Sequence, residues 1–390
     1  MKILLITGIF PPDHGGPATY IPLIAQELLG QNHRISVITL SDALPDHPEN
    51  YPYPIKRIKR RQNILIRVIK TIWSILHHAK DHDVLYTNGL HFEAVIANLI
   101  LRKPLIHKFV GDYAWEKARS MHWTNYEFEE FQKELPLPFR LRFLKTIRNF
   151  YAQRAHHIIV PSIFLKKCVS KWGIPEEKIT VVYNAAPEIK HLEHTIPSPL
   201  NTNVTIVYAG RLVSWKNVDS IIKIASDIKE AGIIIIGDGE EKENLQALAK
   251  KLKIEDRVWF TGYQDKKQFY SLMKTSDIFI LFSNYEGFPH IILESMKIGI
   301  PVIATNAGGN SELLINGYNC LLIEKDNYQQ LLSAVKQLLQ DRETREKIIH
   351  GAEMTMENFS VSRMVSETEK VLLATVEKNR LKGSIKQRNR

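Results

Sequence analysis

Short apolar runs rich in β-branched residues alternate with segments of helical periodicity along the whole chain. The candidate strands lie at 3–7, 35–40, 84–87, 105–110, 157–160 and 179–182, and then at 204–209, 233–237, 258–261, 278–282, 301–305 and 320–323. Strands that alternate with helices pack as parallel sheets with crossover helices on their faces. The pattern therefore predicts an α/β fold of the doubly wound, Rossmann-like type.

The length of the chain favours two such domains. Its 390 residues exceed what one hydrophobic core organises, and 44% of them are apolar. Residues 188–203 are rich in His, Pro, Ser and Thr and show little periodicity, which is typical of a linker. We predict a first domain at 1–187, a linker at 188–203, a second domain at 204–375 and a basic tail at 376–390. Because doubly wound domains bind ligands at the carboxyl ends of their strands, the two domains are expected to face each other across a cleft.

Composition narrows the class of protein. Only Cys168 and Cys320 are present, and they lack ligand spacing, so neither a disulfide framework nor a zinc site is supported. The sequence contains no run of about 18 apolar residues of the kind that spans a membrane. Its apolar start is better explained as a first strand than as a signal peptide. The reducing cytoplasm is the simplest location.

Basic and large apolar residues are interleaved in two segments. The formal net charge is +10, and cations concentrate at 56–61, continuing through 64–73, and again at 140–145. Cations mixed with isoleucines and Trp73 fit a helix that lies on an anionic membrane surface. Nucleic acid attracts the same charge, but no recognition motif accompanies it, so no nucleic-acid partner is expected. The alternative is that these segments are solvated helix faces around a core stripe.

A strand-to-helix turn at 286–294 carries two carboxylates. Gly287 permits a tight bend, Pro289 suits the first helical position, and the amides that follow form an anion site at the positive end of the helix dipole. A carboxylate next to an anion site suits a ligand with hydroxyl groups, so Glu286 and Glu294 could hold two sugar rings joined by phosphates. The alternative is that Glu286 is a solvated loop residue and Glu294 a helix-face charge.

A second loop supplies cations. Residues 204–209 form a candidate strand, Gly210 ends it, and Arg211 and Lys216 follow at its carboxyl end. Arginine can bind phosphate bidentately, and lysine approaches it as a point charge. Together with the carboxylate turn, this loop resembles the donor-binding motif of retaining glycosyltransferases of family 4 (glycosyl transferases group 1). Proteins of that family have the two-domain GT-B fold, and the resemblance extends over nearly the whole chain.

The resemblance implies roles for individual residues. In the family, the first Glu contacts the donor sugar, the second contacts the ribose of the nucleotide, and the Arg and Lys clamp the diphosphate. Those roles fall on Glu286, Glu294, Arg211 and Lys216. Gly237 lies in a loop that passes near the nucleotide in the family, although a plain connection between two elements is an open alternative. The implied donor site comprises Gly15, Gly16, Arg211, Lys216, Gly237, Tyr263, Glu286, Gly287, Phe288, Pro289, His290, Ile291 and Glu294.

The first domain is expected to hold the acceptor. Its first strand leads into a loop with Gly15 and Gly16. This loop resembles the family loop that closes over the donor phosphates. It does not match the G-x-G-x-x-G pattern of dinucleotide sites. Many family members carry a His just before a Gly-Asp step, but here that place is Val110. Asp112 therefore becomes the candidate for positioning or deprotonating the acceptor hydroxyl, and His107 is expected to be packed inside the domain.

These features predict a retaining glycosyltransferase that moves a sugar from a nucleotide-diphosphate sugar to a hydroxyl of a lipid-linked or envelope glycan. Its expected catalytic residues are Asp112, Glu286, Arg211 and Lys216, with Glu116 as the alternative to Asp112. Fixed cations stabilise the leaving diphosphate, so neither a divalent metal nor another cofactor is expected. Two other classes stay open: a sugar-nucleotide epimerase or phosphorylase on the same fold, and a non-catalytic basic module that binds a membrane or nucleic acid. The expected location is cytoplasmic, with a peripheral position on the inner face of the cell membrane if the basic segments bind lipid.

Overall fold

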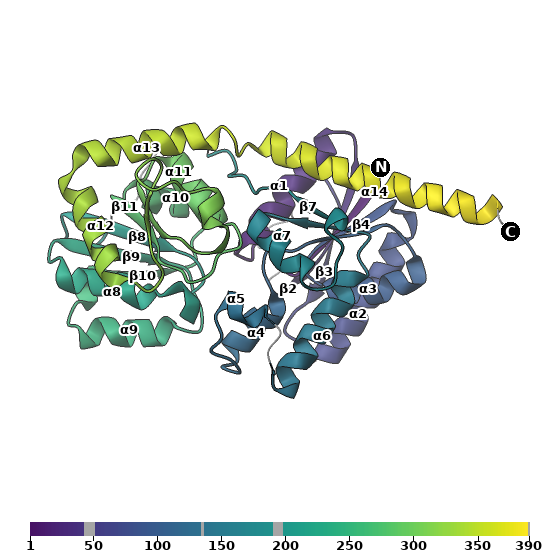
Figure 1. Cartoon of the computed structure of the whole chain (residues 1–390), viewed down its shortest axis with the longest axis horizontal. Coiled ribbons are helices and arrows are strands. Elements are labelled where there is room, and N and C mark those ends of the chain that lie inside the picture. Colours follow the sequence, from purple (N-terminus) through teal and green to yellow (C-terminus); the bar gives the residue numbers. More distant parts are fainter. Residues whose placement is uncertain (43–50, 134–135, 190–197, 389–390) are drawn as a thin grey trace. The chain divides into compact units, whose positions relative to one another are not determined.

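The computed structural model describes residues 1–42, 51–133, 136–189 and 198–388. The chain divides into two compact units, each built on a parallel sheet with helices on its faces (Figure 1). The first unit comprises Met1–Ala118, Gln132–Tyr183 and Ser362–Arg390, and the second comprises Arg119–Phe131 and Asn184–Val361. The prediction of two doubly wound α/β domains is confirmed.

The first unit contains a seven-stranded parallel sheet with strand order β3-β2-β1-β4-β5-β6-β7. Its strands are β1 (Lys2–Thr7), β2 (Arg34–Ser41), β3 (Ile55–Lys59), β4 (Val84–Asn88), β5 (Leu105–Lys108), β6 (His157–Val160) and β7 (Ile179–Val181). The central strands are almost wholly apolar because helices cover both of their faces. The chain builds outward from β1 to β3 and then crosses to β4, so the strand order reverses between β1 and β4. Loops diverge at such a switch point and leave room for ligands.

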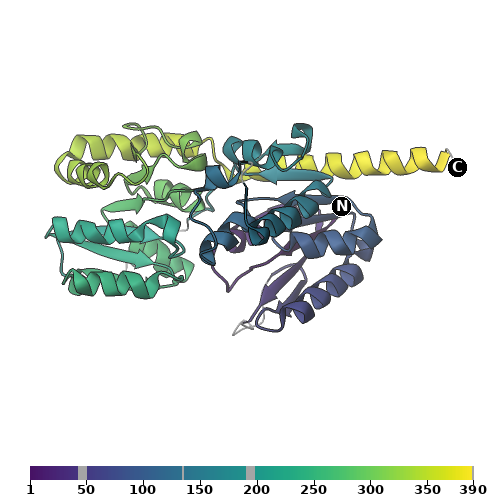
Figure 2. The same ribbon diagram turned by 60° about the horizontal axis from the view of Figure 1, so that its bottom comes forward.

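Seven helices accompany this sheet among the described residues. They are α1 (Gly16–Gly30), α2 (Ile64–His78), α3 (His91–Leu101), α4 (Tyr113–Ser120), α6 (Phe139–Gln153), α7 (Ile163–Ser170) and α14 (Val361–Arg388). Helix α14, yellow in Figures 1 and 2, packs on the first unit. Its Glu369 contacts His33 at 2.7 Å, and its Arg380 pairs with Asp83 at 3.2 Å. The end of the chain is therefore part of the first unit.

The second unit contains a six-stranded parallel sheet with strand order β10-β9-β8-β11-β12-β13. Its strands are β8 (Val204–Ala209), β9 (Ala231–Ile236), β10 (Val258–Gly262), β11 (Ile278–Leu281), β12 (Val302–Thr305) and β13 (Leu321–Ile323). Its helices are α5 (Phe128–Phe131), α8 (Val218–Asp227), α9 (Lys242–Lys251), α10 (Lys266–Lys274), α11 (His290–Ile298), α12 (Tyr328–Gln340) and α13 (Arg342–Met356). The strand order reverses between β8 and β11, which is the switch point of this unit.

The basic segment at 56–73 is not one helix. Residues Ile55–Lys59 form the edge strand β3, and α2 begins only at Ile64, where the side chain of Asn63 accepts a hydrogen bond from the Leu65 amide at 2.9 Å. Along β3 only Ile58 is buried. Lysine and arginine are common on edge strands because they discourage pairing with other chains. The high charge of this strand obscured its alternation in the sequence.

The two units differ from the predicted domain boundaries. Residues 119–131 belong to the second unit, and residues 362–375 belong to the first. The latter lie on α14, whose Met364, Val365 and Leu372 are buried in the first unit. Packing across the sequence decides this grouping, whereas the predicted boundaries assumed contiguous domains. Half of the predicted linker, residues 190–197, and the last two residues of the predicted tail lie outside the described residues.

Candidate functional site

The switch point of the second unit brings together the two loops that the sequence singled out. Arg211 and Lys216 follow β8, and Glu286 follows β11, which is the neighbour of β8 in the sheet. Parallel neighbours end at the same edge, so both loops lie at the carboxyl ends of the strands. The predicted clamp and the predicted carboxylate turn are therefore adjacent in space.

Lys216 and Glu286 form an ion pair at this switch point. Their Nζ and Oε1 atoms lie 2.5 Å apart, and their side chains are only 14% and 8% exposed. Two further hydrogen bonds tie the loops: the Asn284 amide donates to the Trp215 carbonyl at 2.8 Å, and the Asn217 side chain donates to the Asn284 side chain at 2.7 Å. The positions of the cation and the carboxylate are thus fixed by the backbone as well as by their own contact.

Arg211 lies in the loop after β8, which we call the clamp loop, and Gly237 lies in the loop after β9. Arg211 is exposed, and its guanidinium carbon lies 5.8 Å from the centre of the Trp215 ring. Gly237 has φ +136°, and a Cβ atom there would lie 2.0 Å from the carbonyl oxygen of Gly210. Its amide already donates to Gly262 at 2.9 Å. Gly237 therefore lets the loops after β8 and β9 pack together, and its expected approach to the nucleotide stays a prediction.

Helix α11 begins one residue later than expected. Pro289 is its N-cap, with φ −77° and ψ 122°, and the first helical residues are His290 and Ile291. Among the described residues, no side chain caps this helix. The positive end of its dipole lies next to the carboxylate turn, where it favours an anion.

Hydrogen bonds from distant segments hold the carboxylate turn. The Asn184 side chain donates to the Phe288 carbonyl at 3.1 Å, and the Gly309 amide donates to the Glu286 carbonyl at 2.9 Å. Asn184 and Gly287 are buried, and Phe288 is only 4% exposed. The turn is therefore rigid, which suits a site that must hold a ligand in one orientation.

Glu294 and Tyr263 lie at the same edge of the sheet but outside the ion pair. Glu294 is on α11 and accepts a hydrogen bond from the Tyr270 hydroxyl of α10 at 3.2 Å. Burial raises the pKa of Glu294 to about 7. Tyr263 follows β10, is 49% exposed, and has its pKa raised chiefly by burial. The contact of Glu294 with the ribose of the nucleotide and the contact of Tyr263 with its base stay predictions.

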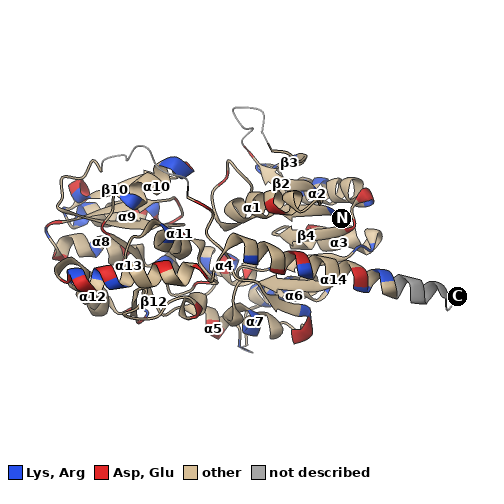
Figure 3. Ribbon diagram, turned by 90° about the horizontal axis from the view of Figure 1, so that it is seen from above, with Lys and Arg blue, Asp and Glu red and all other residues tan. Residues whose placement is uncertain are grey.

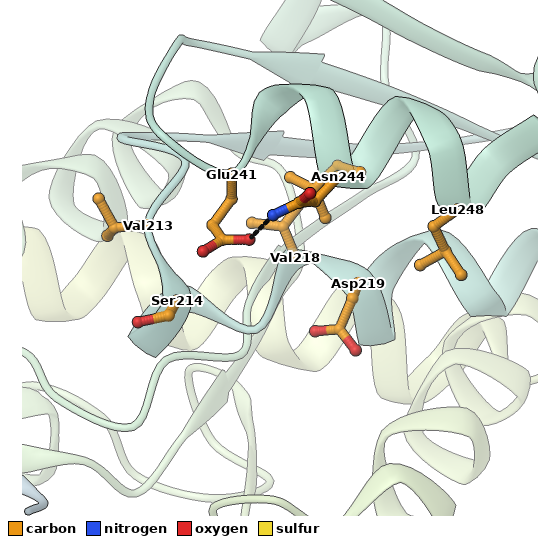
Figure 4. A pocket seen from close by; sticks show the side chains of 8 residues that line it. Val213, Ser214, Val218, Asp219, Glu241, Asn244 and Leu248 are labelled. Carbon is orange, nitrogen blue, oxygen red and sulfur yellow. Dashed lines mark hydrogen bonds between the residues drawn. The ribbon is translucent and has the colours of Figure 1, made fainter. Parts of the chain in front are cut away.

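A hollow of about 230 Å³ lies behind the clamp loop (Figure 4). It is lined by Val213, Ser214, Val218, Asp219, Glu241, Asn244, Leu245 and Leu248. Within it the Glu241 carboxylate accepts a hydrogen bond from the Asn244 side chain at 3.0 Å. None of the predicted donor residues lines this hollow.

In the first unit, Gly15 and Gly16 begin helix α1 at the loop after β1. Gly15 is the N-cap with φ +133°, and α1 starts at Gly16, earlier than the expected start near Tyr20. Arg60 fixes the loop by donating to the Asp13 carboxylate at 3.1 and 2.5 Å. The glycine loop therefore lies at the switch point of its own unit, and its contact with donor phosphates stays a prediction.

Asp112 is not positioned to act on an acceptor. Its side chain has no solvent exposure, accepts hydrogen bonds from the Ala114 amide and the Gln132 side chain at 2.9 Å each, and forms an ion pair with Arg148. Arg148 in turn lies over the Trp172 ring at 4.3 Å. A buried carboxylate with these partners has a structural role, and this burial counts against the expected catalytic role of Asp112, which stays a prediction. The prediction that His107 is packed is confirmed, because it too has no exposure.

Sequence reasoning missed a helical segment next to the site. Residues 119–131 belong to the second unit, where the Phe128 ring stacks on Tyr285 with 3.8 Å between ring centres and Ser120 donates to Glu240 at 2.5 Å. Tyr285 directly precedes Glu286 in the turn. No local pattern could assign this segment to the second unit, because these contacts are distant in sequence.

Comparison with known proteins agrees with this geometry. Residues 14–187 match Glycosyltransferase Family 4, and residues 193–354 match Glycosyl transferases group 1. The O-antigen biosynthesis glycosyltransferase WclY of Escherichia coli is 29% identical over 91% of this chain and 94% of its own length. An uncharacterised glycosyltransferase of Methanocaldococcus jannaschii is 24% identical over 95% of this chain and 98% of its own. The structure of HepE from Anabaena, solved with UDP and glucose, superposes with a TM-score of 0.76 at 22% identity and covers 96% of this chain and all of that one.

The family matches define a glycosyltransferase, and two parallel-sheet units, each with a switch point, give it the GT-B fold. More narrowly, the chain belongs to glycosyltransferase family 4, with a family 4 domain followed by a group 1 domain.

Proposed function

We propose that the enzyme transfers a sugar from a nucleotide-diphosphate sugar to an acceptor hydroxyl with retention of the anomeric configuration. The observation that carries this proposal is the Lys216–Glu286 ion pair at the switch point of the second unit. A diphosphate would take Lys216 as its partner and release the Glu286 carboxylate to accept hydrogen bonds from sugar hydroxyls. One preformed pair thus provides both halves of a donor site.

The chemistry needs stabilisation of the leaving group. As the bond from the anomeric carbon to the diphosphate breaks, negative charge develops on the diphosphate, and Arg211, Lys216 and the amino end of α11 supply fixed positive potential there. The acceptor attacks from the face that the diphosphate leaves, which retains the configuration. In this proposal neither a divalent metal nor another cofactor takes part.

The acceptor class follows from relatives. WclY is named for O-antigen biosynthesis, and a relative from Rhizobium meliloti is named for lipopolysaccharide core biosynthesis. HepE has been solved with UDP-glucose. These names support a nucleotide-sugar donor and an envelope glycan as acceptor. In our proposal the acceptor is an envelope glycan or a lipid-linked one, and transfer takes place at the cytoplasmic face of the cell membrane.

Product analysis tests the proposal. Candidate nucleotide sugars are first screened for thermal stabilisation of the protein, and the product formed with the best donor is examined by proton NMR. The donor's anomeric configuration should reappear in the product, and activity should survive EDTA. Inverted product would overturn the mechanism. Isomerised nucleotide in the absence of acceptor, or sugar phosphate formed with orthophosphate, would instead identify an epimerase or a phosphorylase.

We also propose that the first unit binds an anionic membrane surface. Helix α2 is inverted relative to an ordinary surface helix: its polar Thr71 and Ser74 are buried, whereas Leu65, Ile69 and Trp73 are 69%, 65% and 62% exposed. Exposed apolar stripes of this kind mark interaction sites. None of the described helices has both the length and the hydropathy needed to cross a bilayer.

The neighbouring helices extend this face and give it one sign of charge. Helix α3 packs against both α2 and α6. Neither α2 nor α6 contains Asp or Glu, and Glu93 of α3 is only 9% exposed (Figure 3). Exposed apolar residues lie on all three helices and exposed cations lie on α2 and α6, namely Leu65, Ile69, Lys70, Trp73, Leu99, Ile100, Phe139, Arg140, Arg142 and Phe143. Such a surface complements anionic headgroups with acyl chains beneath them.

Vesicle binding tests this surface without donor or acceptor. The protein should bind vesicles of phosphatidylcholine with phosphatidylglycerol, and the double variant Ile69→Glu, Trp73→Glu should bind about tenfold more weakly or worse. Ile315→Glu is the matched control, because Ile315 is 59% exposed in the second unit. Equal binding by the double variant, competition by an oligonucleotide, or self-association through this face in place of vesicle binding would overturn the proposal.

A further inference from the structure

A chain of hydrogen bonds behind the loop after β4 ends in His91. His107 Nε2 lies 3.2 Å from the Tyr151 carbonyl oxygen, and His107 Nδ1 lies 2.6 Å from the Thr87 hydroxyl oxygen. The same hydroxyl oxygen lies 2.7 Å from His91 Nδ1. His107 and Thr87 are fully buried, whereas His91 is partly exposed. The chain therefore connects a core carbonyl to a side chain at the surface.

The hydrogen bond between His107 Nε2 and the Tyr151 carbonyl determines which atom donates in each of the other hydrogen bonds of this series. Both imidazoles are neutral, because burial lowers the pKa of His107 to about 3 and holds the pKa of His91 well below its usual value. A carbonyl oxygen only accepts, so His107 carries its proton on Nε2 and accepts at Nδ1. The Thr87 hydroxyl must then donate to His107 and accept from His91 Nδ1. It follows that His91 Nε2 is unprotonated and is a hydrogen-bond acceptor.

The fold places His91 at the switch point of the first unit, where a ligand is expected. His91 is the first residue of α3, directly after the end of β4, and β4 pairs with β1 at the switch point. The loops after these strands touch, since a Cβ atom on Gly89 would lie 2.9 Å from the Gly8 amide nitrogen. The Tyr151 ring stacks 5.6 Å from the His91 ring and limits its rotation. His91 Nε2 has no hydrogen-bond partner within the described parts of the chain.

We propose that His91 Nε2 accepts a hydrogen bond from the attacking hydroxyl of the acceptor and orients it. This inference rests on the proposed function. It assigns to His91 the acceptor-positioning role that was expected of Asp112. The acceptor oxygen forms its bond to the anomeric carbon as the bond from that carbon to the diphosphate breaks. The bonding electrons leave with the diphosphate. The hydroxyl proton, which is held by His91 Nε2 before the reaction, leaves that hydrogen bond as the new bond forms and passes to a diphosphate oxygen. His91 stays neutral throughout, and Thr87 acts through it as a positioning residue.

Kinetics on four variants separate this role from a structural one. His91→Phe keeps the ring without the acceptor atom, and should lower kcat/KM for the acceptor about tenfold while leaving donor KM and acceptor-independent donor hydrolysis unchanged. Thr87→Val should reproduce part of the loss, and Thr87→Ser should restore activity. His82→Phe is the matched control, because His82 is a partly buried histidine near the amino end of β4, hydrogen-bonded to Ser36. A parallel loss of donor hydrolysis, or normal transfer by His91→Phe, would overturn the inference.

A second measurement is independent of transfer. Nitrogen-15 NMR of the imidazoles in the intact protein should show His91 protonated on Nδ1 and unprotonated on Nε2 near neutral pH, and Thr87→Val should mix the two tautomers. A proton on Nε2 of His91 in the wild-type protein would overturn the inference even if transfer with retention is established. Failure to find any acceptor, with the expected tautomer present, would count against the proposed function instead.

Discussion

Lys216 Nζ and Glu286 Oε1 lie 2.5 Å apart in a pair that is closed to solvent on most sides. If Lys216 pairs with the diphosphate when the donor binds, removing the cation should weaken donor binding. We expect Lys216→Met to raise donor KM at least about tenfold, since charge-assisted hydrogen bonds contribute roughly 1.5–3 kcal/mol. Lys216→Arg, which keeps the charge, should lose less. Unchanged donor KM in Lys216→Met would contradict the assignment.

Asp112→Ala should damage stability before it damages catalysis. The substitution leaves the Arg148 guanidinium buried without its carboxylate, which costs about 3–5 kcal/mol. Chemical denaturation should show this loss. The double variant Asp112→Ala, Arg148→Met should recover part of it, because no unpaired charge remains. A fully stable Asp112→Ala enzyme with reduced turnover would support the catalytic role that its burial disfavours.

Gly237→Ala should disturb the clamp loop. The new methyl group would meet the Gly210 carbonyl oxygen at 2.0 Å on a backbone with φ +136°, so about 2–3 kcal/mol of stability should be lost, together with donor binding. Gly30→Ala is the control, because nothing lies within 4 Å of the position of its Cβ atom. Thermal unfolding with and without donor measures both effects. Equal behaviour of the two variants would show that the loops do not pack as described.

Glu294 should make stability depend on pH in one direction. Burial raises its pKa from 4.5 to about 7, so the folded protein binds a proton that the unfolded chain releases between these values. The contribution of Glu294 to stability is therefore fully present below pH 4.5 and is lost as pH rises through about 7. Glu294→Gln should match the wild-type Tm at the acid end and exceed it above neutrality. A Tm difference independent of pH would refute the raised pKa.

Lys108 should have the opposite dependence. It lies 4.0 Å over the Tyr20 ring, is 1% exposed, and has no hydrogen-bond partner within the described residues, and burial lowers its pKa to about 7. The unfolded chain then binds the proton that the folded protein lacks, so stability rises with pH from about 7 up to the usual 10.5. A pKa lowered from 10.5 to about 7 corresponds to roughly 5 kcal/mol, so Lys108→Met should be more stable by up to about 5 kcal/mol below neutrality. That gain should shrink in alkaline buffer, and a constant gain would argue against a charged Lys108.

Much of the architecture could be predicted from local pattern. Apolar runs gave the positions of the strands within a few residues, and the glycine and charge content of the loops after β8 and β11 indicated a phosphate and a carboxylate site. These signals are local, because strand periodicity and the residues of a turn depend on neighbours in sequence. The exception was β3, whose lysines and arginine mask an edge strand.

Tertiary packing decided the rest, because it joins residues that no sequence window contains together. It closed Lys216 onto Glu286, and it buried Asp112 against Arg148 although a Gly-Asp step after a strand favours an exposed carboxylate. It also fixed the tautomer of His91 through Thr87. Burial and the direction of a hydrogen bond are set by the whole fold, whereas sequence alone sets which groups are available to it.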